Sequence, residues 1–397
     1  MSANPLPTSN PGSRPSLPWR LGSTALMGAT GAISRTLLYG FNDVEVIGLP
    51  GFMELLDRRK SVKDRKRGLI TDSMIPSSGG FCRCDTASSR ITTGGVLELT
   101  ICVLRTSMFG PPPNLKRAFV PCSSRVVQII DNQSSIRFLS TFFSLGQVLP
   151  THRILHSSHG GLFQPTMTQA IRLLSSQPFA PSFLARPSFV SHESHFTTNG
   201  IDIHLAPSED LDRKHSWVHA FPEGFVHQHR SLDMRYFKWG VSRMILESEP
   251  GPELVPMFIN GTQKIMPEDR TFPRFLPRMG NKVTVAFGES IDTESAFGDL
   301  RGRWKELVSR HCGRTEGEGA VTIGSLDNAP QELKYGPEAT ALRIETTRRV
   351  RDEVSKLRRR LGHPDEDPSF AFAETWANEG AKPKYKSEVD GSLVRKK

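Results

Sequence analysis

Short apolar segments alternate along the chain with stretches that have the periodicity of an α-helix. Thr166–Leu174 places four apolar residues on one helical face, and a second helix is expected over 235–247. Between the helical stretches lie apolar runs of strand length. The predicted strands are Val44–Gly48, one starting at Gly68–Thr71, Phe142–Pro150, Trp217–Ala220, Leu254–Ile259 and Lys282–Phe287. Strands that alternate with helices predict an α/β domain with a mostly parallel sheet flanked by helices.

Residues 16–40 are the best candidate for a segment that touches a membrane. Apolar side chains recur there at roughly helical intervals among small residues, between Arg20 and Arg35. These positions are Leu21, Ala25, Leu26, Met27, Ala29, Ile33, Leu37 and Leu38. The stretch lacks the roughly 18 consecutive apolar residues of a spanning helix. We predict an interfacial amphipathic helix or a re-entrant hairpin around Gly28 and Gly31, although a helix packed on the domain fits equally well.

The rest of the chain divides by composition. Segment 72–138 is rich in Ser, Thr, Gly and Pro, shows almost no regular period, and interrupts the predicted domain. Residues 332–361 are charge-dense but carry a narrow apolar stripe, which indicates a helix docked on the domain. The predicted organisation is 1–15 disordered, 16–40 interfacial helix, 41–312 domain with its interruption, 313–331 linker, 332–361 helix and 362–397 disordered tail.

Composition and charge narrow the class of protein. The chain of 397 residues is 37% hydrophobic and has 33 Gly and 29 Pro, which indicates one globular core with poorly packed flanks. Its 51 basic and 41 acidic side chains give a net charge of +10, which favours a polyanion, either nucleic acid or anionic lipid. Five cysteines at irregular spacing exclude a disulfide scaffold and fit no zinc motif, and His152, His156 and His159 have no partner ligands at metal spacing. We therefore expect no metal site.

Three strand ends carry the candidate chemistry. The turn Phe221-Pro222-Glu223-Gly224 follows a predicted strand, and a carboxylate there can hold a hydroxyl or orient an arginine against a phosphate. Upstream, Gly146-x-x-x-Pro150-x-x-Arg153 leads a strand into a polar loop. Downstream, Val255-Pro256 begins a similar strand and loop.

In combination these segments resemble the glycerolipid acyltransferase family, over about residues 15–70 and 139–292. The resemblance identifies Phe221, Pro222, Glu223 and Gly224 with the family's phosphate-site motif, Gly146 to Arg153 with its arginine motif, and Val255 and Pro256 with its late motif. It implies that Arg153 and Glu223 together hold the glycerophosphate backbone of a lipid substrate.

The run Arg235–Arg243 resembles in particular the mitochondrial phospholipid–lysophospholipid transacylases. That resemblance implies acyl transfer without coenzyme A or another cofactor, cardiolipin remodelling, and phospholipid and lysophospholipid substrates. It also implies peripheral attachment to the inner or outer mitochondrial membrane, facing the intermembrane space. The positive charge suits anionic cardiolipin, and no nucleic-acid motif accompanies it.

The family's catalytic motif, Asn-His-x-Ser-x-x-Asp, is absent, because none of the twelve histidines has an Asp five positions later. We therefore assign no catalytic residue. The motif is expected just after Thr71. Codons shifted by one frame over Ser73–Thr86 allow Asp-Asp-Pro-Leu-Ile-Trp-Gly-Val-Leu-Pro-Leu-Arg-Tyr, which resembles the stretch after the catalytic His in the family. We hypothesise that the chain from about residue 73 is translated out of frame, and that the His-bearing segment was lost at an exon junction.

Three alternatives remain open from the sequence. The protein could be a coenzyme A-dependent lysophospholipid acyltransferase, which an assay with and without the thioester would distinguish. It could be a catalytically inactive membrane-binding protein, because the phosphate motif is present without a general base. A nucleic-acid binder rests on net charge alone, and vesicle against oligonucleotide binding would test it.

Overall fold

The fold is described from a computed structural model. It covers the residues 16–74, 126–131, 137–151, 160–176, 195–196, 198, 204–224, 232–265, 267, 276–312, 326, 329–377, 384–386 and 393–395. The predicted disordered N-terminus, Arg153, the three histidines at 152–159, the four cysteines of segment 72–138 and most of the predicted linker lie outside these residues.

A mostly parallel sheet forms the centre of the molecule. Its strands are β1 (Asp43–Ile47), β2 (Leu69–Met74), β3 (Val126–Asp131), β4 (Val148–Thr151), β7 (Trp217–Ala220), β8 (Glu253–Asn260), β9 (Lys282–Phe287) and β10 (Ile291–Asp292). They lie in the order β1-β9-β8-β2-β7-β3-β4, with β10 paired to β8. From β8 to β4 the strands are parallel, and β9 is antiparallel to β8. The predicted α/β class with a mostly parallel sheet is confirmed.

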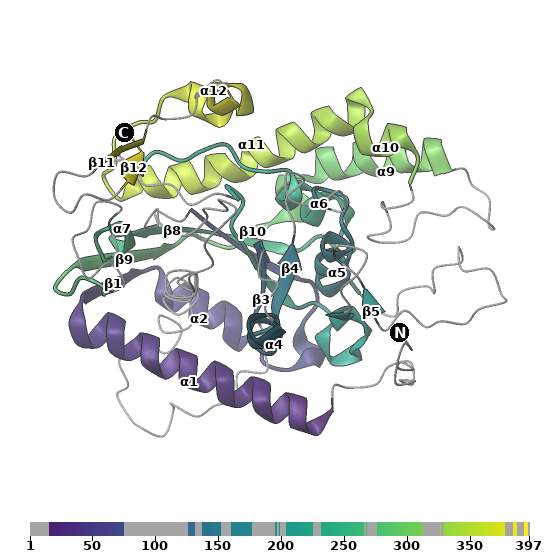
Figure 1. Cartoon of the computed structure of the whole chain (residues 1–397). Coiled ribbons are helices and arrows are strands. Elements are labelled where there is room, and N and C mark those ends of the chain that lie inside the picture. Colours follow the sequence, from purple (N-terminus) through teal and green to yellow (C-terminus); the bar gives the residue numbers. More distant parts are fainter. Residues whose placement is uncertain are drawn as a thin grey trace.

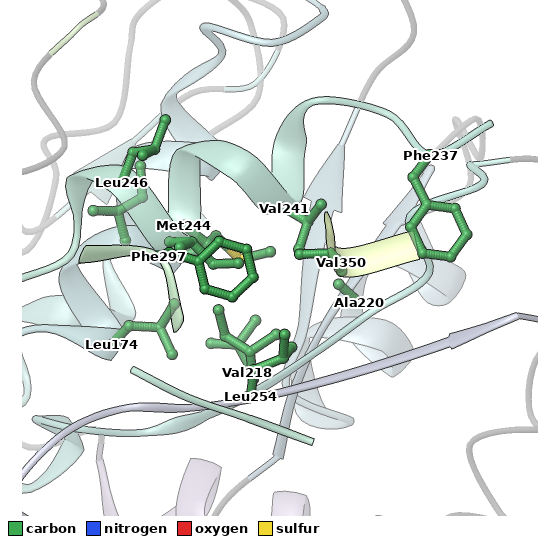
Figure 2. Close-up of a cluster of buried hydrophobic side chains, with 14 of the residues drawn as sticks. Leu174, Val218, Ala220, Phe237, Val241, Met244, Leu246, Leu254, Phe297 and Val350 are labelled. Carbon is green, nitrogen blue, oxygen red and sulfur yellow. The ribbon is translucent and has the colours of Figure 1, made fainter. Parts of the chain in front are cut away.

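Helices cover both faces of the sheet (Figure 1). They are α1 (Leu17–Phe41), α2 (Leu49–Asp57), α4 (Arg137–Leu145), α5 (Pro165–Leu174), α6 (Gly240–Glu247), α7 (Thr262–Ile265), α8 (Thr293–Ala296), α9 (Gly298–Cys312), α10 (Gln331–Tyr335), α11 (Pro337–Arg360) and α12 (Ala373–Ala377). Alternate residues of the strands point to opposite faces, so each face has its own core. Figure 2 shows the core under α6 and α11, where Val218 and Leu254 of the sheet meet Met244 and Val350. The opposite core packs Leu69 and Trp217 against α1 and α2.

The apolar run Phe142–Pro150 was predicted to be one strand, and that prediction is wrong for its first half. Helix α4 ends at Leu145, and β4 begins only at Val148. The Gly146 amide donates to the Phe142 carbonyl at 2.9 Å, and the Gln147 amide donates to the Ser144 carbonyl at 3.0 Å, which closes the helix. An uninterrupted apolar run has no period that distinguishes a buried helix from a strand.

Two predicted helices have different bounds in the structure. The helix expected over 235–247 begins only at Gly240, and 235–238 lies in neither a helix nor a strand. The helix expected over 332–361 is divided at Gly336, and Pro337 starts α11. A Cβ on Gly336 would lie 2.3 Å from the Glu332 carbonyl oxygen, so only glycine permits this close approach between α10 and α11.

The predicted solvated tail begins later than residue 362. Trp376 of α12 stacks on the Arg235 guanidinium at 4.1 Å, and the Glu366 side chain is only 5% exposed. The predicted interruption at 72–138 also differs at its edges, because Asp72 lies in the middle of β2 and Val126–Asp131 pairs with β7 and β4. Part of the segment that looked foreign by composition is therefore a strand of the sheet.

Candidate functional site at the carboxyl edge of the sheet

The candidate site lies where parallel strands end. Strands β8, β2, β7, β3 and β4 run in one direction, so their carboxyl ends lie along one edge of the sheet. In open α/β sheets this edge is where ligands bind. The turn Phe221–Gly224 follows β7 directly and therefore lies at this edge.

The turn is held by backbone hydrogen bonds from two sides. The Gly224 amide donates to the Phe221 carbonyl at 3.0 Å, and the Lys238 amide donates to the Pro222 carbonyl at 2.7 Å. Gly224 has a φ of 56°, and a Cβ there would lie 2.8 Å from the Lys238 side chain. The positive φ is what favours glycine at this position, since the lysine side chain is flexible enough to move away.

Glu223 is the buried carboxyl of this turn. It is 4% exposed, and its Oε1 accepts a hydrogen bond from the Arg235 amide at 2.9 Å. Burial raises the pKa of Glu223 to about 8, a rise that is opposed by the Arg235 amide and by the charges of Arg351 and Arg235 and is increased by Glu366. Near pH 7 the carboxyl therefore holds a proton in most molecules. A protonated carboxyl can donate a hydrogen bond to a phosphate oxygen without repelling it.

The other predicted site residues are only partly brought together. Gly146 is half-buried in the connection between α4 and β4, at the far end of the sheet order from β8. Arg153 lies outside the described residues, so the pairing of Arg153 with Glu223 stays a prediction. Val255 and Pro256 are buried inside β8, opposite Thr71 and Asp72 of β2. Val255 and Pro256 therefore belong to the buried interior of the sheet and do not lie at its carboxyl edge.

A buried polar network beside the site was not anticipated from the sequence. Trp217 Nε1 donates to Thr71 Oγ1 at 2.8 Å, and Thr71 Oγ1 lies 2.6 Å from His219 Nδ1. His219 Nε2 lies 3.4 Å from Ser73 Oγ, so both ring nitrogens face hydroxyl groups of β2. Burial lowers the pKa of His219 to about 3. A fully buried imidazole whose two ring nitrogens both face hydroxyl groups of β2 has the surroundings of a structural group.

Asp72 is a second unanticipated feature of β2. It is fully buried between Ala220 of β7 and Pro256 of β8, and both carboxyl oxygens lack a hydrogen-bond partner among the described residues. Burial raises the pKa of Asp72 well above its usual range. The only signal in the sequence was a charged residue directly after the apolar start of a predicted central strand.

Metal ligands do not gather in the described part of the chain. Among those residues no group of three or more His, Cys, Asp or Glu side chains could hold a metal ion. At the described part of the edge, Glu223 is suited to hydrogen bonding of a phosphate.

Comparison with known proteins adds relatives that share this sequence over part of their length. No protein-family model matches the chain. The chain is 35% identical over 249 residues to tafazzin from Saccharomyces cerevisiae, which covers 60% of the chain and 59% of the yeast protein. It is 33% identical over 87 residues to tafazzin from Drosophila melanogaster, covering 22% of each. It is 34% identical over 79 residues to an N-acylphosphatidylethanolamine synthase from Arabidopsis thaliana, covering 19% of the chain and 28% of the plant protein.

Over part of its length the chain is therefore similar to proteins named for lipid acylation, as the resemblance of its motifs led us to expect. Among them it is similar to tafazzin in particular, on the yeast and Drosophila matches. The chain spans less than two-thirds of the length of the curated relatives it matches.

Proposed function

We propose that the fold of this chain serves acyl transfer between a phospholipid and the hydroxyl of a lysophospholipid. The observation that carries the proposal is the Phe221–Gly224 turn, with its buried Glu223, at the carboxyl edge of the sheet, in a chain that is 35% identical over 249 residues to a tafazzin. In this proposal Glu223 takes part in holding the glycerophosphate group, and the acceptor hydroxyl lies at the end of β2.

The finer proposal is coenzyme A-independent remodelling of cardiolipin at a mitochondrial membrane, facing the intermembrane space. It is supported by the similarity to tafazzin and by the net charge of +10, since cardiolipin is an anionic lipid. A coenzyme A-dependent acyltransferase is the competing enzyme.

The exact chain is proposed to be inactive, because Asn-His-x-Ser-x-x-Asp does not occur in it. Purified full-length protein should bind vesicles that contain cardiolipin, yet transfer no labelled acyl chain from phosphatidylcholine to lysocardiolipin above background, with or without acyl-coenzyme A. Transfer that required the thioester would favour the competing enzyme. Robust transfer abolished by one histidine substitution would show that a general base is present after all.

The outward face of α1 supports attachment to a lipid surface. Its large side chains Leu17, Leu21 and Ile33 are 62–64% exposed, and the helix contains no acidic residue and only two arginines. The C-terminal end of α1 borders a small apolar pocket of about 60 Å³, beside the exposed Leu276 and Met279. None of the helices in the described segments has the length and apolar content needed to cross a membrane. An uncharged exposed face on a 25-residue helix fits a helix that lies in the membrane interface.

A double substitution on this face should weaken vesicle binding. With Leu21→Glu and Ile33→Glu, affinity for vesicles of phosphatidylcholine and cardiolipin should fall by about tenfold or more, because two buried apolar contacts are lost and two charges repel the lipid. Co-sedimentation measures the change. The matched control is Tyr335→Glu with Ile344→Glu, which alters two exposed apolar residues of α10 and α11 on the other face of the sheet. An equal loss in both double variants would contradict the assignment of α1.

A further inference from the structure

The C-terminal helix reaches the candidate site through the backbone of residues 232–235. Arg351 of α11 donates from Nη2 to the Met234 carbonyl at 2.8 Å and from Nε to the Arg235 carbonyl at 3.1 Å. Glu366, beyond the end of α11, accepts the Met234 amide on Oε1 at 2.7 Å and Arg351 Nη2 on Oε2 at 2.7 Å. Two side chains from the C-terminal region thus bind three polar groups of the backbone at Met234 and Arg235.

Arg358 makes further contacts with the same segment, at Leu232 and Asp233. Its Nε donates to the Leu232 carbonyl at 3.0 Å, and its Nη2 donates to Asp233 Oδ1 at 2.7 Å. Its Nη1 donates to the Pro364 carbonyl, and Nε also lies 3.5 Å from Glu366 Oε1. The Arg358 side chain is fully buried. We call Arg351, Arg358 and Glu366 the C-terminal clasp.

The backbone that the clasp holds is the one that holds Glu223. The Arg235 amide, one residue beyond Met234, donates to Glu223 Oε1. The carbonyls of 232, 234 and 235 and the amides of 234 and 235 are all bonded to the clasp or to Glu223. Because these groups are already bonded, they are not used within a helix, and this explains why the helix predicted from residue 235 begins only at Gly240.

Helix α11 has a separate anchor at its other end. Arg343 donates to the carbonyls of Leu333 and Lys334, and its guanidinium lies about 5 Å from the rings of Phe163 and Trp304. Val350 is buried in the core between the two anchors. Weakening the clasp should therefore leave α11 docked on the domain.

We propose that Arg351 and Glu366 are positioning residues, which hold the 232–235 backbone so that Glu223 is fixed in the orientation needed to bind a phosphate group. The phosphate ligand rests on the proposed function, whereas the effect of the clasp on Glu223 does not. The clasp acts through the Arg235 amide, so neither residue needs to touch the substrate.

The test uses the full chain with ¹³C-carboxyl-labelled glutamate, in which the Glu223 signal is identified by its loss in Glu223→Gln. Glu366→Gln keeps the size of the side chain and removes its charge, and Arg351→Lys keeps the charge and removes the fork that bonds two carbonyls. In both variants the Glu223 titration midpoint should fall by about half a pH unit or more, because water reaches the carboxyl and, for Glu366→Gln, a negative neighbour is lost. Affinity for glycerol 3-phosphate should fall by about fivefold or more.

Arg348→Lys is the matched control. Arg348 lies on the same helix and pairs with Glu345 and Asp352, but its side chain is 51% exposed and none of its hydrogen bonds reaches 232–235. It should leave the Glu223 midpoint and the affinity unchanged. Folded variants that keep both values would overturn the proposal, and so would clasp variants that fail to fold, since the contacts would then be merely structural. A native chain without affinity for glycerol 3-phosphate would instead contradict the proposed function, while the Glu223 midpoint would still test the clasp.

Discussion

Asp72→Val should make the protein more stable, by about 2 kcal/mol or more in the free energy of unfolding at neutral pH. Asp72 is fully buried in the central strand β2, and neither carboxyl oxygen has a hydrogen-bond partner in the described part of the chain. Burying a polar group without a partner costs free energy that an apolar side chain does not cost. Valine also suits a buried strand better than aspartate.

The gain should depend on pH. Burial raises the pKa of Asp72 in the folded protein, whereas in the unfolded chain it titrates near its usual value of about 4. Below that value both states hold the proton. Above it the unfolded state releases its proton first, so the folded state loses stability as the pH rises towards the folded pKa. The advantage of Asp72→Val is therefore smallest below about pH 4 and increases with pH.

Urea unfolding of both proteins from pH 4 to pH 8 measures this difference. Asp72→Asn is the control, because it removes the titration but keeps an unsatisfied polar group of nearly the same shape. The stability of Asp72→Asn should differ from that of Asp72→Val by an amount that does not change with pH. At low pH, Asp72→Asn should be little more stable than the native protein. A loss of stability in Asp72→Val would show that the carboxyl has a partner at this place in the native protein.

Restoring the family motif after Thr71 should produce acyl transfer, at about 10²–10⁴ times the rate of the protein with the unaltered sequence. The variant carries Asn-His-x-Ser-x-x directly before the Asp-Asp-Pro-Leu-Ile-Trp-Gly-Val-Leu-Pro-Leu-Arg-Tyr that the shifted frame allows, in place of Asp72–Thr86. Strand β2 lies beside β7 in the sheet, with Asp72 opposite Ala220. A histidine at the end of β2 would therefore lie beside the Phe221–Gly224 turn, since neighbouring strands are about 5 Å apart.

This arrangement would bring a general base and the phosphate-binding turn to one substrate. The motif's Asp would fix the imidazole tautomer and stabilise its protonated form. Transfer between labelled phosphatidylcholine and lysocardiolipin measures the gain, and the same variant with the motif His changed to Ala is the control. Equal activity of the two variants would contradict the role of the motif. Sequencing the transcript tests the frame hypothesis directly, because an in-frame transcript that matches this chain would refute it.

The two unanticipated groups in β2 bear on that hypothesis. Thr71 is hydrogen-bonded to Trp217 and His219, as expected of a buried polar residue in a native strand. Asp72, the next residue, is a buried carboxyl for which the described segments offer no partner. From Thr71 to Asp72 the side chains change from hydrogen-bonded to unsatisfied. This is the place where the resemblance to the acyltransferases stops.

Local sequence was enough to predict most of the strands and the Phe221–Gly224 turn. Strands built from short apolar runs, turns and the amphipathic helix α5 are determined mainly by residues close together in the chain. Local sequence patterns therefore predict them well. Local patterns failed where one apolar run is compatible with both a helix and a strand, as in Phe142–Pro150. They also failed where a close contact between two helices requires a glycine, as at Gly336.

The surroundings of Glu223 depended instead on residues more than a hundred positions away. Nothing near Arg235 in the chain indicates that Arg351, Arg358 and Glu366 occupy the backbone groups of 232–235, and so keep Arg235 out of the helix that begins at Gly240. The same is true of Asp72, whose neighbours in the sheet, Ala220 of β7 and Pro256 of β8, are more than a hundred positions away in the chain. Burial and hydrogen-bond partners arise when distant segments pack together, so the carboxyl in the motif could be recognised from the sequence, while its protonation and its support came from the tertiary structure.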